Sequence, residues 1–114
     1  MAINFETTDP QKLLAAYKAA IAQGHVDTWA VDKNGNFTHT PPQWKDQAVL
    51  RPTIYNGWLV MNFYLMKGQK TTNALYGVYH GRFIESMLTH CDKLFTNSTA
   101  TAMPTNADRV TLAA

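Results

Sequence analysis

The residues best suited to acid–base or anion chemistry are gathered between His80 and Glu85, in the run His-Gly-Arg-Phe-Ile-Glu. If a helix begins at Gly81, its free backbone N–H groups and the side chains of His80 and Arg82 would bind a carboxylate or a phosphate. If a helix runs through Gly81, the same N–H groups are used within the helix and the anion site does not form. The secondary structure around Gly81 therefore decides whether this site exists.

His39 is a second candidate base or metal ligand. A catalytic site would combine the side chains of His39, His80 and Glu85, with Arg82 binding an anionic substrate. Such a site needs His39 and His80 to line one pocket. His80, Glu85 and His90 are spaced by five residues, and this step turns a helix by about 140°, so they do not converge on one metal ion. A histidine on an apolar face is more often a hydrogen-bonded core residue, and we expect neither a metal nor a cofactor.

Composition narrows the classes of protein. The 114 residues fit one domain over residues 1–114, and 16% are charged, below the usual value of about 25%. A net charge of +2 with scattered Lys and Arg argues against a nucleic-acid partner. The single cysteine, Cys91, excludes an internal disulfide, and we see neither a signal peptide nor a membrane span. We expect a cytoplasmic protein with residues 105–114 free to fray.

Two segments have the apolar spacing of amphipathic helices. The first covers about residues 10–23. Asp9 suits its N-terminal cap, Pro10 suits the first helical position, and Gly24 suits a left-handed end. These signals predict a helix of three to four turns near the start of the chain.

The second helix is predicted from about residue 73 to residue 94, capped by Thr71 or Thr72. The alternative is a short strand that gives way to a helix near Gly81, but the residues before Gly81 alternate poorly. We favour one continuous helix although Gly77 and Gly81 each cost about 1 kcal/mol against Ala. With their small neighbours these glycines form a face that another backbone can approach closely.

The first hairpin turns between Asp32 and Gly35, and two registers compete. A two-residue turn at Asn34 and Gly35 would put the flanking aromatic residues on opposite faces. A type I turn that starts at Asp32 and has Gly35 in the left-handed position gathers the apolar residues on one face. We favour this second register, which pairs these residues across the hairpin: Trp29 with His39, and Val31 with Phe37.

The second hairpin turns at Asn56 and Gly57, and its register follows from a two-residue turn. The pairs on its apolar face are Ile54 with Leu59, Pro52 with Met61, Leu50 with Phe63, and Ala48 with Leu65. Because Pro52 lacks an N–H group, its strand is expected at an edge or interrupted there. The opposite face holds these residues: Val49, Arg51, Thr53, Tyr55, Trp58, Val60, Asn62 and Tyr64.

These elements predict an α+β fold, in which an antiparallel sheet of two hairpins and a short C-terminal strand near residues 98–103 packs with the two helices. Both helices are expected on the apolar face, which leaves the opposite face for a partner. Aromatic residues and arginine with few lysines are typical of interface cores. We therefore expect a non-enzymatic binding or adaptor protein, homodimeric or holding a protein segment, whose contacts come from these residues: Arg51, Tyr55, Trp58, Val60 and Tyr64. The alternative is a small enzyme or anion-binding domain that uses His39, His80, Arg82 and Glu85.

Overall fold

The computed structural model describes residues 2–109, and within them the chain forms one antiparallel six-stranded sheet and two α-helices. This confirms the predicted α+β class. The elements follow in this order: β1 (Ala2–Glu6), α1 (Pro10–Ala22), β2 (Trp29–Val31), β3 (Phe37–His39), β4 (Ala48–Tyr55), β5 (Trp58–Leu65), α2 (Asn73–Cys91), a 3-10 turn η1 (Asp92–Leu94) and β6 (Asn97–Ala100).

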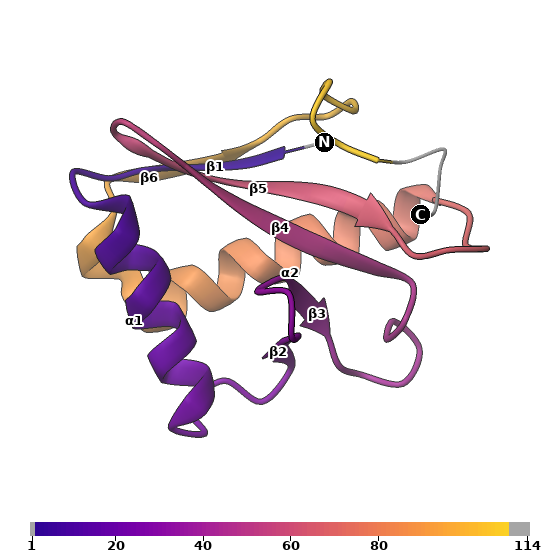
Figure 1. Ribbon diagram of the computed structural model, residues 1–114, viewed down its shortest axis with the longest axis horizontal. Coiled ribbons are helices and arrows are strands. Elements are labelled where there is room, and N and C mark those ends of the chain that lie inside the picture. The colour runs from indigo at the N-terminus through magenta and orange to yellow at the C-terminus, as the bar shows by residue number, and fades with distance from the viewer. Residues whose placement is uncertain (1, 110–114) are drawn as a thin grey trace.

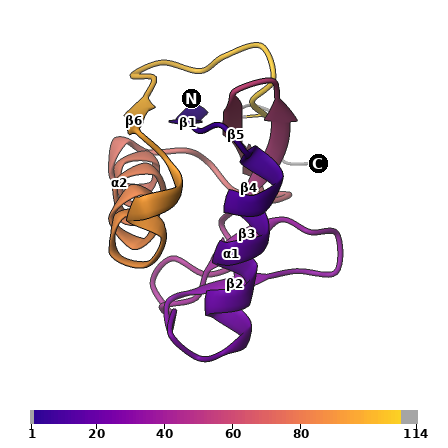
Figure 2. The ribbon, with the colours of Figure 1, turned by 90° about the vertical axis from the view of Figure 1, so that its left-hand side faces the viewer.

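The strands lie in the order β2-β3-β4-β5-β1-β6. Both helices lie on one side of the sheet, below it in Figure 1 and side by side in Figure 2. Helix α1 contacts β2, β4, β5 and α2, whereas α2 contacts β1. Among residues 2–109 the other side of the sheet is covered by no helix, as the hairpin pattern predicts. Neither helix in this range has the combination of length and apolar character that crossing a bilayer would require.

Both hairpins have the predicted registers. In the first, Trp29 pairs with His39, and Gly35 has a φ of +81°, the left-handed conformation that the turn requires. The Asp32 carboxylate accepts hydrogen bonds from the backbone N–H groups of Asn34 (2.8 Å) and Asn36 (3.0 Å), which fixes this turn.

In the second hairpin all four predicted pairs of the apolar face are present. Strand β4 lies inside the sheet, but its pairing with β3 is limited to Phe37 opposite Leu50. Pro52 lies beyond that pair, on a stretch of β4 with one open edge. This agrees with the expected interruption, since a residue without an N–H group interferes little with an edge that has no partner.

The helix caps follow the sequence signals. The Asp9 side chain accepts a hydrogen bond from the Lys12 backbone at 3.1 Å, and Gly24 has a φ of +80° at the end of α1. The Thr72 hydroxyl accepts a hydrogen bond from the Leu75 backbone at 3.0 Å. Helix α2 then continues without a break through Gly81 to Cys91, so the single-helix prediction is correct.

Phe83 of α2 lies at the centre of the core. Its ring meets four others nearly edge to face, with centroid distances of 6.0 Å to Phe5, 5.1 Å to Tyr17, 5.0 Å to Trp29 and 5.5 Å to Phe37. These rings come from β1, α1, β2 and β3. One aromatic side chain therefore joins both helices to the strands, and edge-to-face pairs add about 0.5–1.5 kcal/mol each to the burial of apolar area.

Strand β1 is absent from the sequence prediction, and it lies between β5 and β6. Ile3 and Phe5 are fully buried, whereas Asn4 and Glu6 point to the other face. Strand β6 pairs with β1 and covers Asn97–Ala100 rather than the predicted 98–103. The predicted sheet therefore had the correct hairpins but lacked β1, the strand that lies between the second hairpin and β6 in the sheet.

The segment from Thr101 to Arg109, named here the C-terminal segment, is bound to the sheet. The Arg109 N–H donates to the Phe63 carbonyl at 2.9 Å, and the Leu65 N–H donates to the Arg109 carbonyl at 2.8 Å. Of the tail expected to fray, Thr105, Asp108 and Arg109 are thus hydrogen-bonded, and residues 110–114 lie outside the described residues.

Candidate functional site

The outer face is the side of the sheet that points away from both helices. Its hairpin part comes from alternate residues of β4 and β5, which the pleat places on the same side. The register adds Asn4 beside Val60 and Glu6 beside Trp58, both from β1. The predicted face is therefore one strand wider than the hairpin that revealed it.

One end of the outer face, near the turn between β4 and β5, is open to solvent. Tyr55 is 51% exposed, and Trp58, its partner across the hairpin, is 37% exposed. Val60, two residues further along β5 on the same face, is half-buried. Large apolar side chains in neighbouring positions form a continuous patch rather than scattered surface residues.

The other end is covered by the C-terminal segment. Asn62 and Val49 are only 4% and 6% exposed. The Asp108 carboxylate is buried and accepts hydrogen bonds from the Asn62 side chain (2.8 Å), the Phe63 backbone (3.0 Å) and the Thr105 backbone (2.8 Å). This carboxylate holds the segment on the sheet, because charge-assisted hydrogen bonds are about twice as strong as neutral ones.

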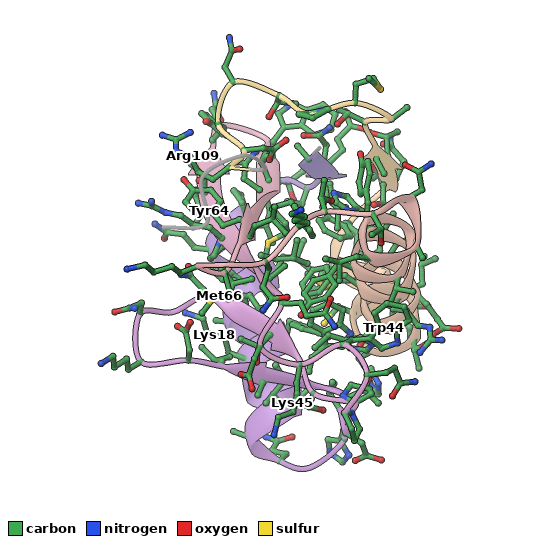
Figure 3. The ribbon with its side chains drawn as sticks, turned by 90° about the vertical axis from the view of Figure 1, so that its right-hand side faces the viewer. Lys18, Trp44, Lys45, Tyr64, Met66 and Arg109 are labelled. Atoms are coloured by element: carbon green, nitrogen blue, oxygen red, sulfur yellow. The ribbon has the colours of Figure 1, made fainter. Side chains whose placement is uncertain are left out.

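Tyr64 lies at the boundary between the open and covered ends. The guanidinium carbons of Arg51 and Arg109 each lie 5.7 Å from the centre of its ring, and Arg51 Nη1 donates to the Tyr64 hydroxyl at 3.3 Å. Figure 3 shows Tyr64 and Arg109 on the side of the molecule opposite α2. Arg51 is exposed, so a cationic side chain stands at this end of the face.

Beside Trp58, at the turn end, the surface forms a hollow of about 620 Å³. Glu6 contributes a carboxylate to it, and Oε1 of Glu6 accepts hydrogen bonds from Thr96 Oγ1 (3.0 Å) and Asn97 Nδ2 (2.5 Å). The carboxylate is thus held in place next to an indole ring. The remaining lining residues are Thr7, Thr8, Asn56, Gly57 and Thr96.

His39 is a core residue. Its ring stacks on Trp29 with centroids 4.4 Å apart, and Nδ1 donates to the Thr28 carbonyl at 2.8 Å. Burial lowers the pKa of His39, and the Arg82 charge lowers it further. His39 is fully buried, so it does not have the solvent access that a catalytic base needs.

His80 lies in a different environment. Its Nδ1 donates to the Tyr76 carbonyl one turn earlier at 2.8 Å, and its ring packs against Tyr76 and Phe63. It lines a shallow hollow with Thr101 of the C-terminal segment, whereas His39 is enclosed by Trp29 and other aromatic rings. The two histidines therefore do not form the shared pocket that the enzyme hypothesis needs.

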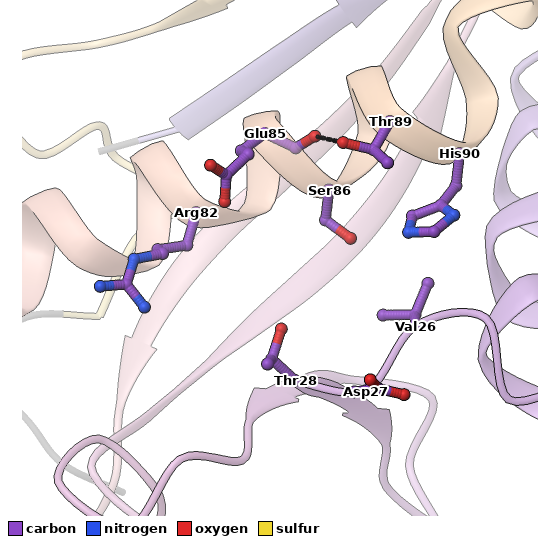
Figure 4. A pocket seen from close by; sticks show the side chains of 8 residues that line it. All are labelled: Val26, Asp27, Thr28, Arg82, Glu85, Ser86, Thr89 and His90. Carbon is purple, nitrogen blue, oxygen red and sulfur yellow. Dashed lines mark hydrogen bonds between the residues drawn. The ribbon is translucent and has the colours of Figure 1, made fainter.

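The anion site predicted from His80, Gly81 and Arg82 is not formed. Gly81 is in the interior of α2, so the N–H groups around it belong to the helix and are not free to bind an anion. Arg82 and Glu85 instead line a polar hollow of about 470 Å³ between α2 and residues 26–28, shown in Figure 4. His90 lines the same hollow, but within residues 2–109 no three His, Cys, Asp or Glu side chains come together in a metal-binding arrangement.

Cys91 is buried against the core. Burial raises the pKa of its thiol, and the Asp92 carboxylate raises it further. A thiol with a raised pKa is a poor nucleophile at neutral pH, so Cys91 has a packing role.

The part of the outer face that the hairpin pattern missed is Glu6 with its supporting residues. The signal for it was the alternation of Ile3, Asn4, Phe5 and Glu6. Five residues with two large apolar side chains are a weak strand signal, since short alternating runs also occur in loops.

The turn end of the outer face thus presents two exposed aromatic side chains, Tyr55 and Trp58, that no other part of residues 2–109 covers. The polar hollow of Figure 4 contains charges of both signs. Compared with models of known protein families, with curated proteins and with solved structures, this chain has no match.

Proposed function

We propose that the chain is a small non-enzymatic binding protein that forms a homodimer through the open part of its outer face. The observation that carries this proposal is the exposure of Trp58 and Tyr55, at 37% and 51%, on a sheet face whose opposite side packs both helices. The contact residues are Arg51, Tyr55, Trp58, Val60 and Tyr64. Each of these side chains points away from the core of its own subunit.

The chemistry of the face supports association. The hairpin contributes three aromatic side chains and one arginine, and no lysine, to the outer face. Interfaces are enriched in aromatic residues and arginine, and depleted of lysine, because rigid rings and the guanidinium group lose less conformational freedom on binding. Exposed aromatic side chains at 37% and 51% have area left to bury.

Association through the face is favoured over association through the open edge of β4. Beyond Leu50 that edge has no partner strand among the described residues. Pro52 lies on it and provides no N–H group, and a proline on an edge strand discourages pairing with another chain. A partner therefore gains more from the aromatic side chains than from the backbone of β4.

The alternative of an enzyme or anion-binding domain has less support, because His39 and His80 lie in separate environments and Gly81 is inside a helix. A cytoplasmic location is part of the proposal and fits a buried thiol at Cys91. A protein partner fits the small net charge better than a nucleic acid does.

The test is sedimentation of the purified chain over a concentration series from about 1 to 100 μM, the range in which weak dimers of standard interfaces dissociate. We expect a monomer–dimer equilibrium. A chain that remains monomeric throughout the series would remove the proposal.

A further inference from the structure

Two opposite charges flank the open face in symmetric positions. Glu6 is on β1 beside Trp58, and Arg51 is on β4 beside Asn62, so the two charges lie on opposite sides of β5. Val60 is halfway between Trp58 and Asn62 on β5. Val60 therefore marks the midpoint between the negative and the positive charge.

The spacing follows from sheet geometry. Trp58 and Asn62 are four residues apart along β5, and β1 and β4 are its two neighbours. With about 3.4 Å per residue and about 4.8 Å between strands, Glu6 and Arg51 are separated by about 17 Å. A second copy laid face to face, with a two-fold axis through Val60 and perpendicular to this line, places each Glu6 over the Arg51 of the other copy.

We infer that the occupant of the face is a second copy of this chain, and that Arg51 of each copy binds in the hollow beside Glu6 and Trp58 of the other. This inference rests on the proposed function and specifies its geometry. A closed two-fold dimer uses the same patch on both subunits, so the two Glu6–Arg51 contacts form together. The self-complementary charges select this partner over a chain of unrelated sequence.

The hollow has the chemistry that a guanidinium group requires. The Glu6 carboxylate is held by Thr96 and Asn97, so little freedom is lost when it binds a cation. The Trp58 ring beside it offers a cation–π surface, and Arg51 already makes such a contact with Tyr64 in its own subunit. With a volume of about 620 Å³, the hollow can accept the end of an arginine side chain.

The C-terminal segment leaves this contact open. The segment lies along the same edge of β5 as β1. Strand β1 pairs with residues 58–62 of β5, and Arg109 forms backbone hydrogen bonds with Phe63 and Leu65, just beyond that stretch. Arg51 lies on the other side of β5 and is exposed. The segment therefore covers one end of the face without covering the charge that would reach the partner.

The expected dimer is weak. The outer face consists of three strands of at most eight residues, which span about 14 Å by 27 Å, or about 400 Å² of projected area. Standard interfaces bury about 800 Å² per partner. Because the total binding energy of such a small interface is low, the two charge contacts form a large part of it, and changing them should alter the dissociation constant measurably.

The experiment uses two charge reversals, Glu6→Arg and Arg51→Glu. Each variant alone places like charges opposite each other twice, and we expect the dissociation constant to rise about ten- to thirty-fold, from the small energies of exposed pairs. An equimolar mixture of the two variants restores opposite charges at both contacts. We expect the mixture to recover a dimer close to the wild-type affinity, measured by sedimentation or by mixing fluorescently labelled chains.

Glu85→Arg on α2 is the matched control, since it makes the same charge change away from the face and should leave the dissociation constant unchanged. If Glu6→Arg fails to fold because Thr96 and Asn97 lose their acceptor, Glu6→Gln and Arg51→Gln replace it. Combined in one chain, these two changes should weaken the dimer less than the product of their single effects.

The outcomes separate the inference from the proposal on which it rests. If the wild type dimerises and Trp58→Ala weakens it, but the two reversed variants do not restore each other, the two-fold arrangement is wrong and the face remains the interface. Additive effects of Glu6→Gln and Arg51→Gln lead to the same conclusion. A monomeric wild type would overturn both.

Discussion

Replacing Trp58 with alanine tests the proposed interface at the residue with the largest ring. Trp58 is 37% exposed in the single chain. For a side chain of about 250 Å², this leaves about 90 Å² to be buried by a partner. At about 25 cal/mol per Å², this area contributes about 2 kcal/mol per copy, or about 4–5 kcal/mol in a two-fold dimer. The dissociation constant should therefore rise on the order of 10³-fold.

The assay is sedimentation equilibrium, with circular dichroism to confirm that the variant is folded. Trp58 is already partly packed in its own subunit, so the variant is also expected to melt at a lower temperature. Tyr55→Ala serves as a second variant, because Tyr55 is 51% exposed and has fewer contacts to lose. Leu88→Ala is the matched control, because Leu88 is 52% exposed but lies on α2.

The reasoning is refuted if Trp58→Ala and Tyr55→Ala fold and dimerise with the same affinity as Leu88→Ala. That result would mean that the bare aromatic face is not the contact surface. The interface would then have to be sought on another part of the described chain, such as the outer side of α2.

Three further predictions concern the single chain. Asp108→Ala should lower the free energy of unfolding by about 3 kcal/mol, because it leaves the buried Phe63 N–H without its acceptor and the Asn62 amide with only the longer contact to Thr105 Oγ1 (3.3 Å), and urea denaturation of wild type and variant measures this. Because burial lowers the pKa of His39, the unfolded chain binds more protons below about pH 6.5, so stability is full above that pH and is lost as the pH falls toward the folded pKa. The part of the slope that comes from His39 should be at most about 1.4 kcal/mol per pH unit, and the difference between wild type and His39→Gln in urea titrations between pH 5 and 8 measures it. Gly77→Ala and Gly81→Ala should each stabilise the chain by up to about 1 kcal/mol in thermal melts, since a Cβ at either position meets nothing within 4 Å; a loss of stability would contradict the exposed position of this helix face.

Most of the local structure was predictable because it depends on short-range chemistry. The turn at Asn56 and Gly57 fixes the register of the second hairpin, and the apolar pattern then selects the core face. In the first hairpin, grouping Trp29 with His39 selected the correct register of two. The caps at Asp9 and Thr72 follow the same logic, since a side chain there bonds to a backbone group three residues away.

The parts of the fold that the sequence did not predict, β1 and the C-terminal segment, depend on contacts between residues far apart in the chain. Strand β1 has few residues, and only its insertion between β5 and β6 makes it a strand. The C-terminal segment is fixed by Asp108, whose partner Asn62 appeared in the sequence as a polar residue among apolar ones. The polar residue in that run thus has a specific partner, which neither spacing nor propensity could reveal.

For the candidate site, the hairpin residues Tyr55, Trp58 and Tyr64 were predictable, whereas Glu6 was not. Its contribution requires the register of β1 against β5. His39 is a case in which the sequence indicated a site that the structure does not have. A histidine can act as a base or a ligand, but His39 is buried beside Trp29 and has no access to solvent. Residue type alone could not distinguish these environments.

The position of β1 has a consequence for how the chain folds during synthesis. Strand β1 leaves the ribosome before both strands that pair with it, β5 and β6, which are made much later. Until then Ile3 and Phe5 have no strand to hold them over the core. Sheets that depend on pairings between distant parts of a chain fold slowly, and their incomplete forms expose apolar surface. We therefore expect this sheet to close only after β6 has been synthesised, with refolding slower than that of a helical bundle of the same length.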